Sequence, residues 1–126
     1  MLKLIIAGGR DFTDYKLLEH EVKQFIIEIA GDQKLRRDDV EIVSGLARGA
    51  DSLGIDFANE HWLPVVEFIA DWDKYGKSAG PFRNEEMAKY ATHCIVFWDG
   101  KSTGSKNMIE NCKKYNLTYK IIQYET

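Results

Sequence analysis

Cysteine is scarce in this sequence, which contains only Cys94 and Cys112. Neither belongs to a Cys-x-x-Cys pair or to a Cys/His cluster with the spacing of metal ligands. We therefore expect reduced core thiols, no metal site and no required cofactor. The chain has 126 residues, of which 44% are hydrophobic, so it can bury a core without disulfides or metals. We expect one domain that spans residues 1–126.

Long hydrophobic runs are also missing. No stretch approaches the roughly 20 apolar residues of a membrane helix, and the apolar run at the start is too short for a signal peptide. We expect a soluble, cytoplasmic protein without membrane contact. Basic residues are not in excess either, since the formal net charge is −3. Proteins that coat nucleic acid usually present a basic face, so we do not expect nucleic acid as a partner.

Short apolar runs alternate with amphipathic segments along the whole chain. The apolar runs predict strands, and the 3.6-residue periodicity between them predicts helices. The expected strands cover residues 2–7, 40–43, 65–70, 93–98 and 118–123. Residues 71–80 are expected to form a polar loop, and Pro81 suits the first turn of the next helix. This alternation predicts a three-layer α/β fold with a mainly parallel, five-stranded sheet and helices on both faces.

Glycine is concentrated at one edge of this predicted sheet. Eight of the ten glycines lie in the segments that follow the first four strands, residues 8–11, 44–51, 71–84 and 99–105. Ligands of open parallel sheets bind at the carboxyl ends of the strands. Glycine lets a backbone approach an anion closely, and amides at the start of a helix point towards it. The sequence therefore predicts a local phosphate site at this edge.

The same segments provide the side chains of the expected site. Hydroxyls can cap a helix or bind a phosphate, arginine and lysine can neutralise it, and Trp72 can stack on a base. Plain structural roles stay open, because Ser44 can cap a helix and Trp72 can shield the edge of the sheet. Residues 100–105 match neither a Walker A motif nor a Gly-x-Gly-x-x-Gly fingerprint. The candidate ligand-binding residues are Gly8, Gly9, Arg10, Ser44, Gly45, Arg48, Gly49, Asp51, Trp72, Lys77, Gly80, Arg83, Asn84, Gly100, Thr103, Gly104 and Ser105.

Three motifs in these segments occur in a recognisable order. They are Gly-Gly-Arg-Asp-Phe at 8–12, Ser-Gly-Leu-Ala-Arg-Gly-Ala-Asp at 44–51, and Asp-Trp leading to Gly-Pro-Phe-Arg-Asn within 71–84. Over roughly residues 4–115 the chain resembles the YspA-like branch of the SLOG superfamily. The resemblance implies a Rossmann-like sheet of order 3-2-1-4-5 and a pocket for nucleotides or nucleotide-derived molecules. It also implies a role in bacterial or phage conflict or signalling, and a homodimer or higher homo-oligomer.

The same superfamily holds the LOG phosphoribohydrolases, which cleave the N-glycosidic bond of nucleoside monophosphates. In those enzymes a glycine-rich run is followed three residues later by a catalytic glutamate. Counted from Ser105, that position falls on Met108 here, and Glu110 lies roughly 200° further round the helix. We assign no catalytic residue. The residues to check are Arg83, which can take the part of the LOG arginine, and Glu85, Glu86 and Asp51 as substitute acids.

The sequence thus predicts a binding protein for a small nucleotide-like ligand, acting as a sensor, carrier or sequestering domain. One alternative is a LOG-like hydrolase of the nucleotide glycosidic bond. A second is single-stranded DNA binding, because the DNA-processing protein of natural transformation carries a Ser-Gly-x-Ala-Arg-Gly stretch that matches residues 44–49.

Overall fold

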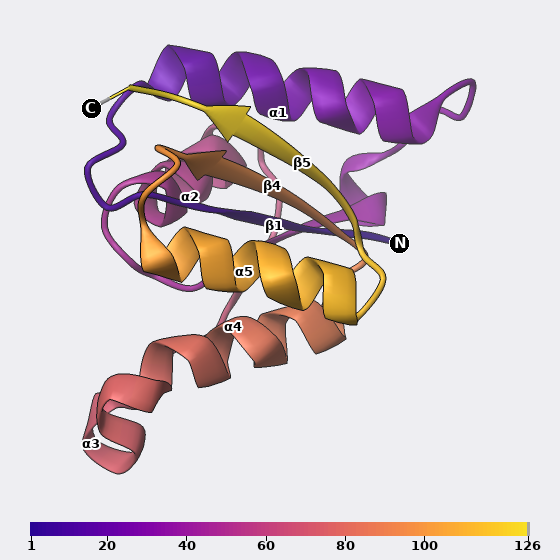
Figure 1. Cartoon of the computed structure of the whole chain (residues 1–126). Helices are drawn as coiled ribbons and strands as arrows, with labels where there is room; N and C mark the ends of the chain where they lie inside the picture. The colour runs from indigo at the N-terminus through magenta and orange to yellow at the C-terminus, as the bar shows by residue number, and fades with distance from the viewer. Residues whose placement is uncertain (126) are drawn as a thin grey trace.

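Five strands form one sheet in the order β3-β2-β1-β4-β5, and every neighbouring pair is parallel. A computed structural model describes residues 1–125 (Figure 1). The predicted sheet order and fold class are confirmed. The strands are β1 (Leu2–Gly8), β2 (Val40–Ser44), β3 (Val65–Glu67), β4 (His93–Trp98) and β5 (Thr118–Gln123).

Helices cover both faces of this sheet. α1 (Tyr15–Ala30) and α2 (Ala50–Glu60) pack on one face, and α4 (Ala79–Tyr90) and α5 (Thr103–Lys114) pack on the other. Successive side chains of a strand point to opposite faces. In β1, Leu4 and Ile6 accordingly join the core under α1 and α2, whereas Ile5 and Ala7 join the core under α4 and α5.

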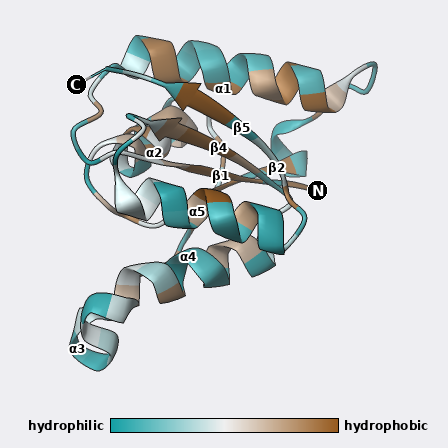
Figure 2. Cartoon of the chain, viewed as in Figure 1, coloured by the Kyte–Doolittle hydropathy of each residue, from teal (hydrophilic) through white to brown (hydrophobic). Residues whose placement is uncertain are grey.

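A strand buried on both sides needs a continuous apolar run, which is why β1 was recognisable in the sequence. Figure 2 shows these hydrophobic strands between helices whose outer faces are largely hydrophilic. Both cysteines are free and buried, Cys94 in β4 and Cys112 in α5. No helix within residues 1–125 has the length and apolar character needed to cross a membrane.

Two predictions about local structure were wrong. β3 ends at Glu67 rather than at residue 70, because its neighbour β2 ends at Ser44 and leaves nothing to pair with beyond Phe68. The expected loop 71–80 is mostly helical, with α3 (Trp72–Tyr75) and the 3-10 turn η2 (Gly76–Ser78) leading directly into α4. The Asp71 side chain caps α3 by accepting a hydrogen bond from the Lys74 amide at 3.1 Å.

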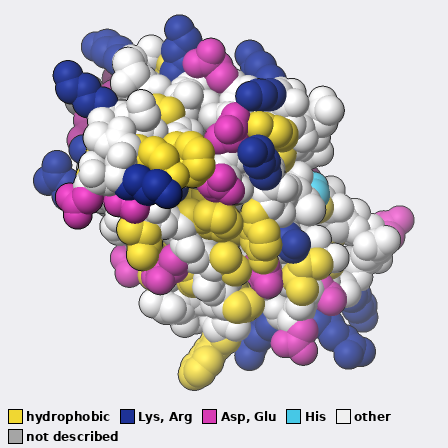
Figure 3. Space-filling view, turned by 90° about the horizontal axis from the view of Figure 1, so that it is seen from below, with side chains coloured by type: hydrophobic (Ala, Val, Ile, Leu, Met, Phe, Trp, Pro, Cys, Tyr) yellow, Lys and Arg dark blue, Asp and Glu magenta, His cyan; other side chains and the backbone are white. Residues whose placement is uncertain are grey.

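These short elements form an arm that projects from the body of the molecule at the start of α4 (Figure 1). A second 3-10 turn, η1 (Arg37–Asp39), precedes β2. Figure 3 shows the molecule from below, as oriented in Figure 1. This surface exposes hydrophobic side chains in its middle, and most of the charged side chains lie around them.

The turns after β1 and β2 are joined directly to each other. The Ala50 amide donates to the Gly9 carbonyl oxygen at 3.1 Å. Gly49 has a positive φ of 78°, and a Cβ there would collide with that same Gly9 oxygen. Only glycine lets these two backbones approach so closely.

Replacing Gly49 by alanine tests this packing, with Gly31 as the matched control. Both residues have nearly the same backbone angles, φ 78° and ψ −127° against φ 57° and ψ −122°, but a Cβ at Gly31 would meet nothing within 4 Å. Strain costs about 1–3 kcal/mol in each variant, and overpacking should cost Gly49→Ala a further ~1–3 kcal/mol. Urea unfolding measures both values, and equal losses would contradict the packing described above.

Candidate functional site

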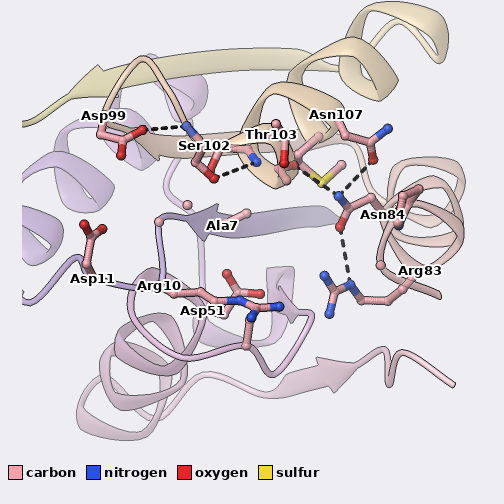
Figure 4. Close-up of a pocket in the computed structure, with 18 of the residues that line it drawn as sticks. Ala7, Arg10, Asp11, Asp51, Arg83, Asn84, Asp99, Ser102, Thr103 and Asn107 are labelled. Carbon is pink, nitrogen blue, oxygen red and sulfur yellow. Dashed lines mark hydrogen bonds between the residues drawn. The ribbon is translucent and has the colours of Figure 1, made fainter. Parts of the chain in front are cut away.

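A cavity of about 640 Å³ opens at the carboxyl edge of the sheet (Figure 4). Its walls come from the turns after β1 and β4, the start of α2, the projecting arm and the first turns of α4 and α5. This volume is in the range of small-molecule sites, about 300–1,000 Å³. The predicted residues that line it are Gly8, Gly9, Arg10, Asp51, Trp72, Lys77, Gly80, Arg83, Asn84, Thr103, Gly104 and Ser105.

Three predicted residues, Ser44, Gly49 and Gly100, line neither this cavity nor the smaller one beside it, and their expected ligand contacts stay predictions. The buried Ser44 hydroxyl accepts from the Leu46 amide at 3.2 Å and donates to the Asp51 carbonyl at 3.3 Å, which braces the turn. Gly49 packs against the β1 turn, and Gly100 has a φ of 83° in the turn after β4. Each shapes the backbone that carries the cavity rather than its surface.

Two other predicted residues, Gly45 and Arg48, line a second cavity of about 300 Å³ beside the first. Its remaining lining residues are Arg10, Leu46, Ala47, Ile69, Ala70, Trp72 and Arg83. Arg10, Ala47, Trp72 and Arg83 line both cavities, so the two spaces adjoin.

The candidate residues left out several polar residues of the first cavity. Asp11, Asp99 and Ser102 lie within the predicted site segments, whereas Asn107 lies beyond them. Asn107 lies one turn beyond Thr103, so helical periodicity alone places it on the cavity side of α5. Asp99 and Ser102 carry the usual signs of a turn followed by a helix cap. Met108 also lines the cavity, so the position of the LOG glutamate does face this space.

At the cavity wall, the start of α5 leaves backbone amides without partners inside the helix. The Asp99 carboxylate accepts from the Ser102 and Lys101 amides at 2.8 and 2.9 Å, and these bonds lower its pKa. Ser102 caps the helix by accepting from the Ser105 amide. The amides of Thr103 and Gly104 lie in the first turn, where they have no acceptor within the helix. The N-terminal end of the helix dipole also favours negative charge here.

The Ser105 hydroxyl is the unusual group of this turn. Its side chain is buried, with 4% of the residue exposed, and its oxygen has no hydrogen-bond partner within residues 1–125. Buried polar side chains in folded proteins nearly always have a partner. Ser105 lines the cavity, so a ligand can supply that partner.

Arg83 and Asn84 connect α4 to the other walls of the cavity. Arg83 Nη1 donates to the Gly45 carbonyl at 2.8 Å, and Arg83 Nε donates to Asn84 Oδ1 at 3.3 Å. Asn84 Nδ2 in turn donates to Asn107 Oδ1 at 3.0 Å and to the Gly104 carbonyl at 3.3 Å. Figure 4 shows the Arg83 guanidinium directed into the cavity. The network fixes its orientation before any ligand arrives.

Asp51 is a buried carboxylate in the same wall, with only 4% of the residue exposed. Burial raises its pKa from the usual 3.8 to about 6. The charge of Arg83 and hydrogen bonds from the Ala47, Gly8 and Gly45 amides oppose that rise. Gly45 lies between the two charged side chains, since a Cβ there would be 2.9 Å from both Arg83 and Asp51 atoms.

The other substitute acids lie outside the cavity. Glu85 is bound to Lys114 at 2.9 Å, and neither Glu85 nor Glu86 is among the residues lining either cavity. Glu19, Glu60 and His61 cluster elsewhere, with atoms within 4.8 Å of one another. Hydrogen bonds within the protein account for that cluster, because His61 contacts Glu19 at 2.9 Å and Tyr15 donates to Glu60 at 2.6 Å.

The raised pKa of Asp51 predicts how stability depends on pH. A carboxyl whose pKa is raised by folding from 3.8 to about 6 favours the folded state most when it is protonated. At 1.36 kcal/mol per pKa unit, wild type should lose about 2 kcal/mol relative to Asp51→Asn as pH rises from 4 to 7. Urea unfolding of both proteins across this range measures the difference. A pH-independent difference would show that Asp51 titrates normally.

Known proteins resemble this chain in sequence and in fold. Residues 2–75 match the family model described as the YspA, cpYpsA-related SLOG family. The chain is also 34% identical over 124 residues to the Gene 61 protein of Mycobacterium phage D29, and the match covers 93% of each protein.

Two solved structures share the fold. The DNA processing protein A (DprA) of Streptococcus pneumoniae matches 99% of the chain with a TM-score of 0.75 at 18% identity. DprA of Helicobacter pylori, whose structure was described for its single-stranded DNA binding mode, matches 98% with a TM-score of 0.69, also at 18% identity. The chain spans 51% of the first protein and 66% of the second, and identity this low shows the fold alone.

The family match extends over more than half of the chain, and the phage relative is similar over nearly all of it. The chain therefore belongs to the YspA, cpYpsA-related SLOG family.

Proposed function

We propose that this protein binds a phosphate-bearing, nucleotide-like ligand in the 640 Å³ cavity, as a sensor, carrier or sequestering domain. The observation that carries the proposal is the buried Ser105 hydroxyl, which has no partner within residues 1–125. Leaving a buried polar group unpaired costs about 1–3 kcal/mol. A phosphate at the start of α5 would pair with this hydroxyl and with the free amides of Thr103 and Gly104.

The charges around the cavity suit the rest of a nucleotide. Arg10 and Lys77 line the cavity, and neither forms an ion pair within residues 1–125. They and Arg83 would neutralise the phosphate. The carboxylates of Asp11 and Asp99 would repel it, but they are acceptors for sugar hydroxyls or for the N–H groups of a base. Trp72 is half exposed at the mouth and offers a ring for stacking.

Family membership and the phage relative support a role in phage–host conflict or signalling as part of the same proposal. The fold neighbours support a second candidate, single-stranded DNA binding, because one of them was described in that context. They weaken the expectation from the acidic net charge that nucleic acid is not a partner. Three arginines lining the second cavity support the same candidate.

The Ser105→Ala variant should separate ligand binding from stability. The free protein should keep or gain stability, because the substitution removes an unpaired buried hydroxyl. Affinity for a bound phosphate should fall about tenfold, since a hydrogen bond to a charged group contributes ~1.5–3 kcal/mol. Calorimetric titration with a panel of nucleoside mono- and diphosphates measures the affinity, and thermal unfolding measures the stability.

Ser78→Ala is the control for this experiment, because Ser78 is exposed, caps no helix through its side chain and lines neither cavity. It should change neither quantity. Wild type that binds none of the panel would refute the proposed function. Unchanged affinity in Ser105→Ala would place the phosphate elsewhere in the cavity.

A separate prediction concerns glycosidic cleavage. That reaction passes through a cationic sugar-like transition state, which a nearby carboxylate stabilises. Met108 occupies the corresponding position and offers no charge. Chromatography should detect no free base after wild type is incubated with nucleoside monophosphates, and Met108→Glu is assayed under the same conditions for comparison. Steady base release by wild type that is abolished in Asp51→Asn would instead establish a hydrolase with Asp51 as its acid.

A further inference from the structure

The second cavity differs from the first in the charges that line it. The lining of the first cavity combines Arg10, Lys77 and Arg83 with three aspartates. The lining of the second cavity has Arg10, Arg48 and Arg83 and contains no aspartate or glutamate among the described residues. A space with three guanidinium groups and no carboxylate favours an anion more strongly than the first cavity does.

Large apolar side chains stand beside these arginines. Leu46, Ile69 and Trp72 line the second cavity and remain 37%, 76% and 51% exposed. Single exposed apolar residues are common, but several at one cavity indicate a surface for contact. Arginine planes and aromatic rings both stack on nucleic-acid bases. The second cavity therefore offers partners for a phosphate and for a base.

The backbone also carries strain at this place. Leu46 has a φ of 62°, a left-handed conformation that costs a residue with a Cβ about 1–2 kcal/mol. The buried Ser44 hydroxyl holds this turn by accepting from the Leu46 amide at 3.2 Å. The strained turn presents the leucine side chain to the cavity rather than to the core. Strain of this kind is concentrated at ligand sites.

The size of the second cavity indicates that it extends the first. About 300 Å³ is at the lower limit for an independent small-molecule site. Arg10, Trp72 and Arg83 belong to both linings, so a ligand that fills the first cavity already touches the border of the second.

We infer that the ligand contains at least two nucleotide units joined by a phosphodiester, and that the second unit occupies the arginine-lined cavity. The linking phosphate would lie at the shared residues Arg10 and Arg83. The second base would pack on Leu46 and Ile69, with the Arg48 guanidinium stacked on its ring. This inference rests on the proposed function and specifies its ligand class, whether a free dinucleotide or a segment of a single strand.

The test compares nucleoside monophosphates with 5′-phosphorylated dinucleotides of the same base, titrated calorimetrically at one salt concentration. Wild type should bind the best dinucleotide at least tenfold more tightly than the best mononucleotide. Arg48 lines only the second cavity, so Arg48→Gln should weaken dinucleotide binding about tenfold and mononucleotide binding less than twofold. Arg37→Gln is the charge-matched control, because Arg37 is exposed and lines neither cavity, and it should change neither affinity.

Leu46→Gly provides a second variant that does not depend on charge. Glycine relieves the left-handed strain, so the variant should fold at least as stably as wild type while losing dinucleotide affinity. A 12-residue oligonucleotide distinguishes the two sources of the ligand. Tighter binding than the dinucleotide, with a steep salt dependence, would identify a single strand, and equal binding would identify a free dinucleotide.

The outcomes separate this inference from the proposed function. Wild type that binds neither mononucleotides nor dinucleotides would refute both. Wild type that binds mononucleotides, but dinucleotides no more tightly, would refute only the second nucleotide unit. Equal loss of both affinities in Arg48→Gln would also refute it, since Arg48 would then serve the first cavity.

Discussion

The carboxyl edge of the sheet depends on one buried carboxylate, that of Asp51. Two turns direct backbone amides at it, that of Gly8 at the end of β1 and those of Gly45 and Ala47 after β2, and Arg83 lies nearby with the opposite charge. Removing a carboxylate from water is unfavourable, and its raised pKa records that cost. The amides gain a strong acceptor in exchange, so the turns after β1 and β2 are held in one arrangement.

This arrangement leaves no room for a side chain at two positions of these turns, Gly45 and Gly49. Gly45 lies between Asp51 and Arg83, and Gly49 lies against the β1 turn. At Gly45 the wall of the second cavity therefore consists of backbone atoms, and the charged Asp51 carboxylate lies buried behind them. Hydrogen bonds to the Gly45 carbonyl and to Asn84 hold Arg83 at the wall of the first cavity. The atoms that hold the turns in place are therefore the same atoms that we propose to position the ligand-binding arginine.

Most of the fold and part of the candidate site could be predicted from the sequence. The strands β4 and β5 were predicted with their observed ends. The buried strand β4 is an apolar run with a strong signal, whereas the edge strand β5 is partly exposed and was bounded by the residues around it. The helix α3 was missed, since four residues are too few to show a period. The glycine turns located the edge correctly. Which of their residues face a cavity depends on contacts such as Asn84 to Asn107, 23 positions apart, and no local pattern encodes those contacts.

The arm formed by α3 and η2 has a consequence for the rate of ligand exchange. Its helix packs mainly against η2 and α4, and all four of its residues lie outside the buried core. Segments with few buried contacts open locally at a small fraction of the cost of global unfolding. Trp72 stands on this arm at the border of both cavities. For the proposed ligand, we therefore expect the arm to govern the residence time and the turns opposite to govern which molecule is retained.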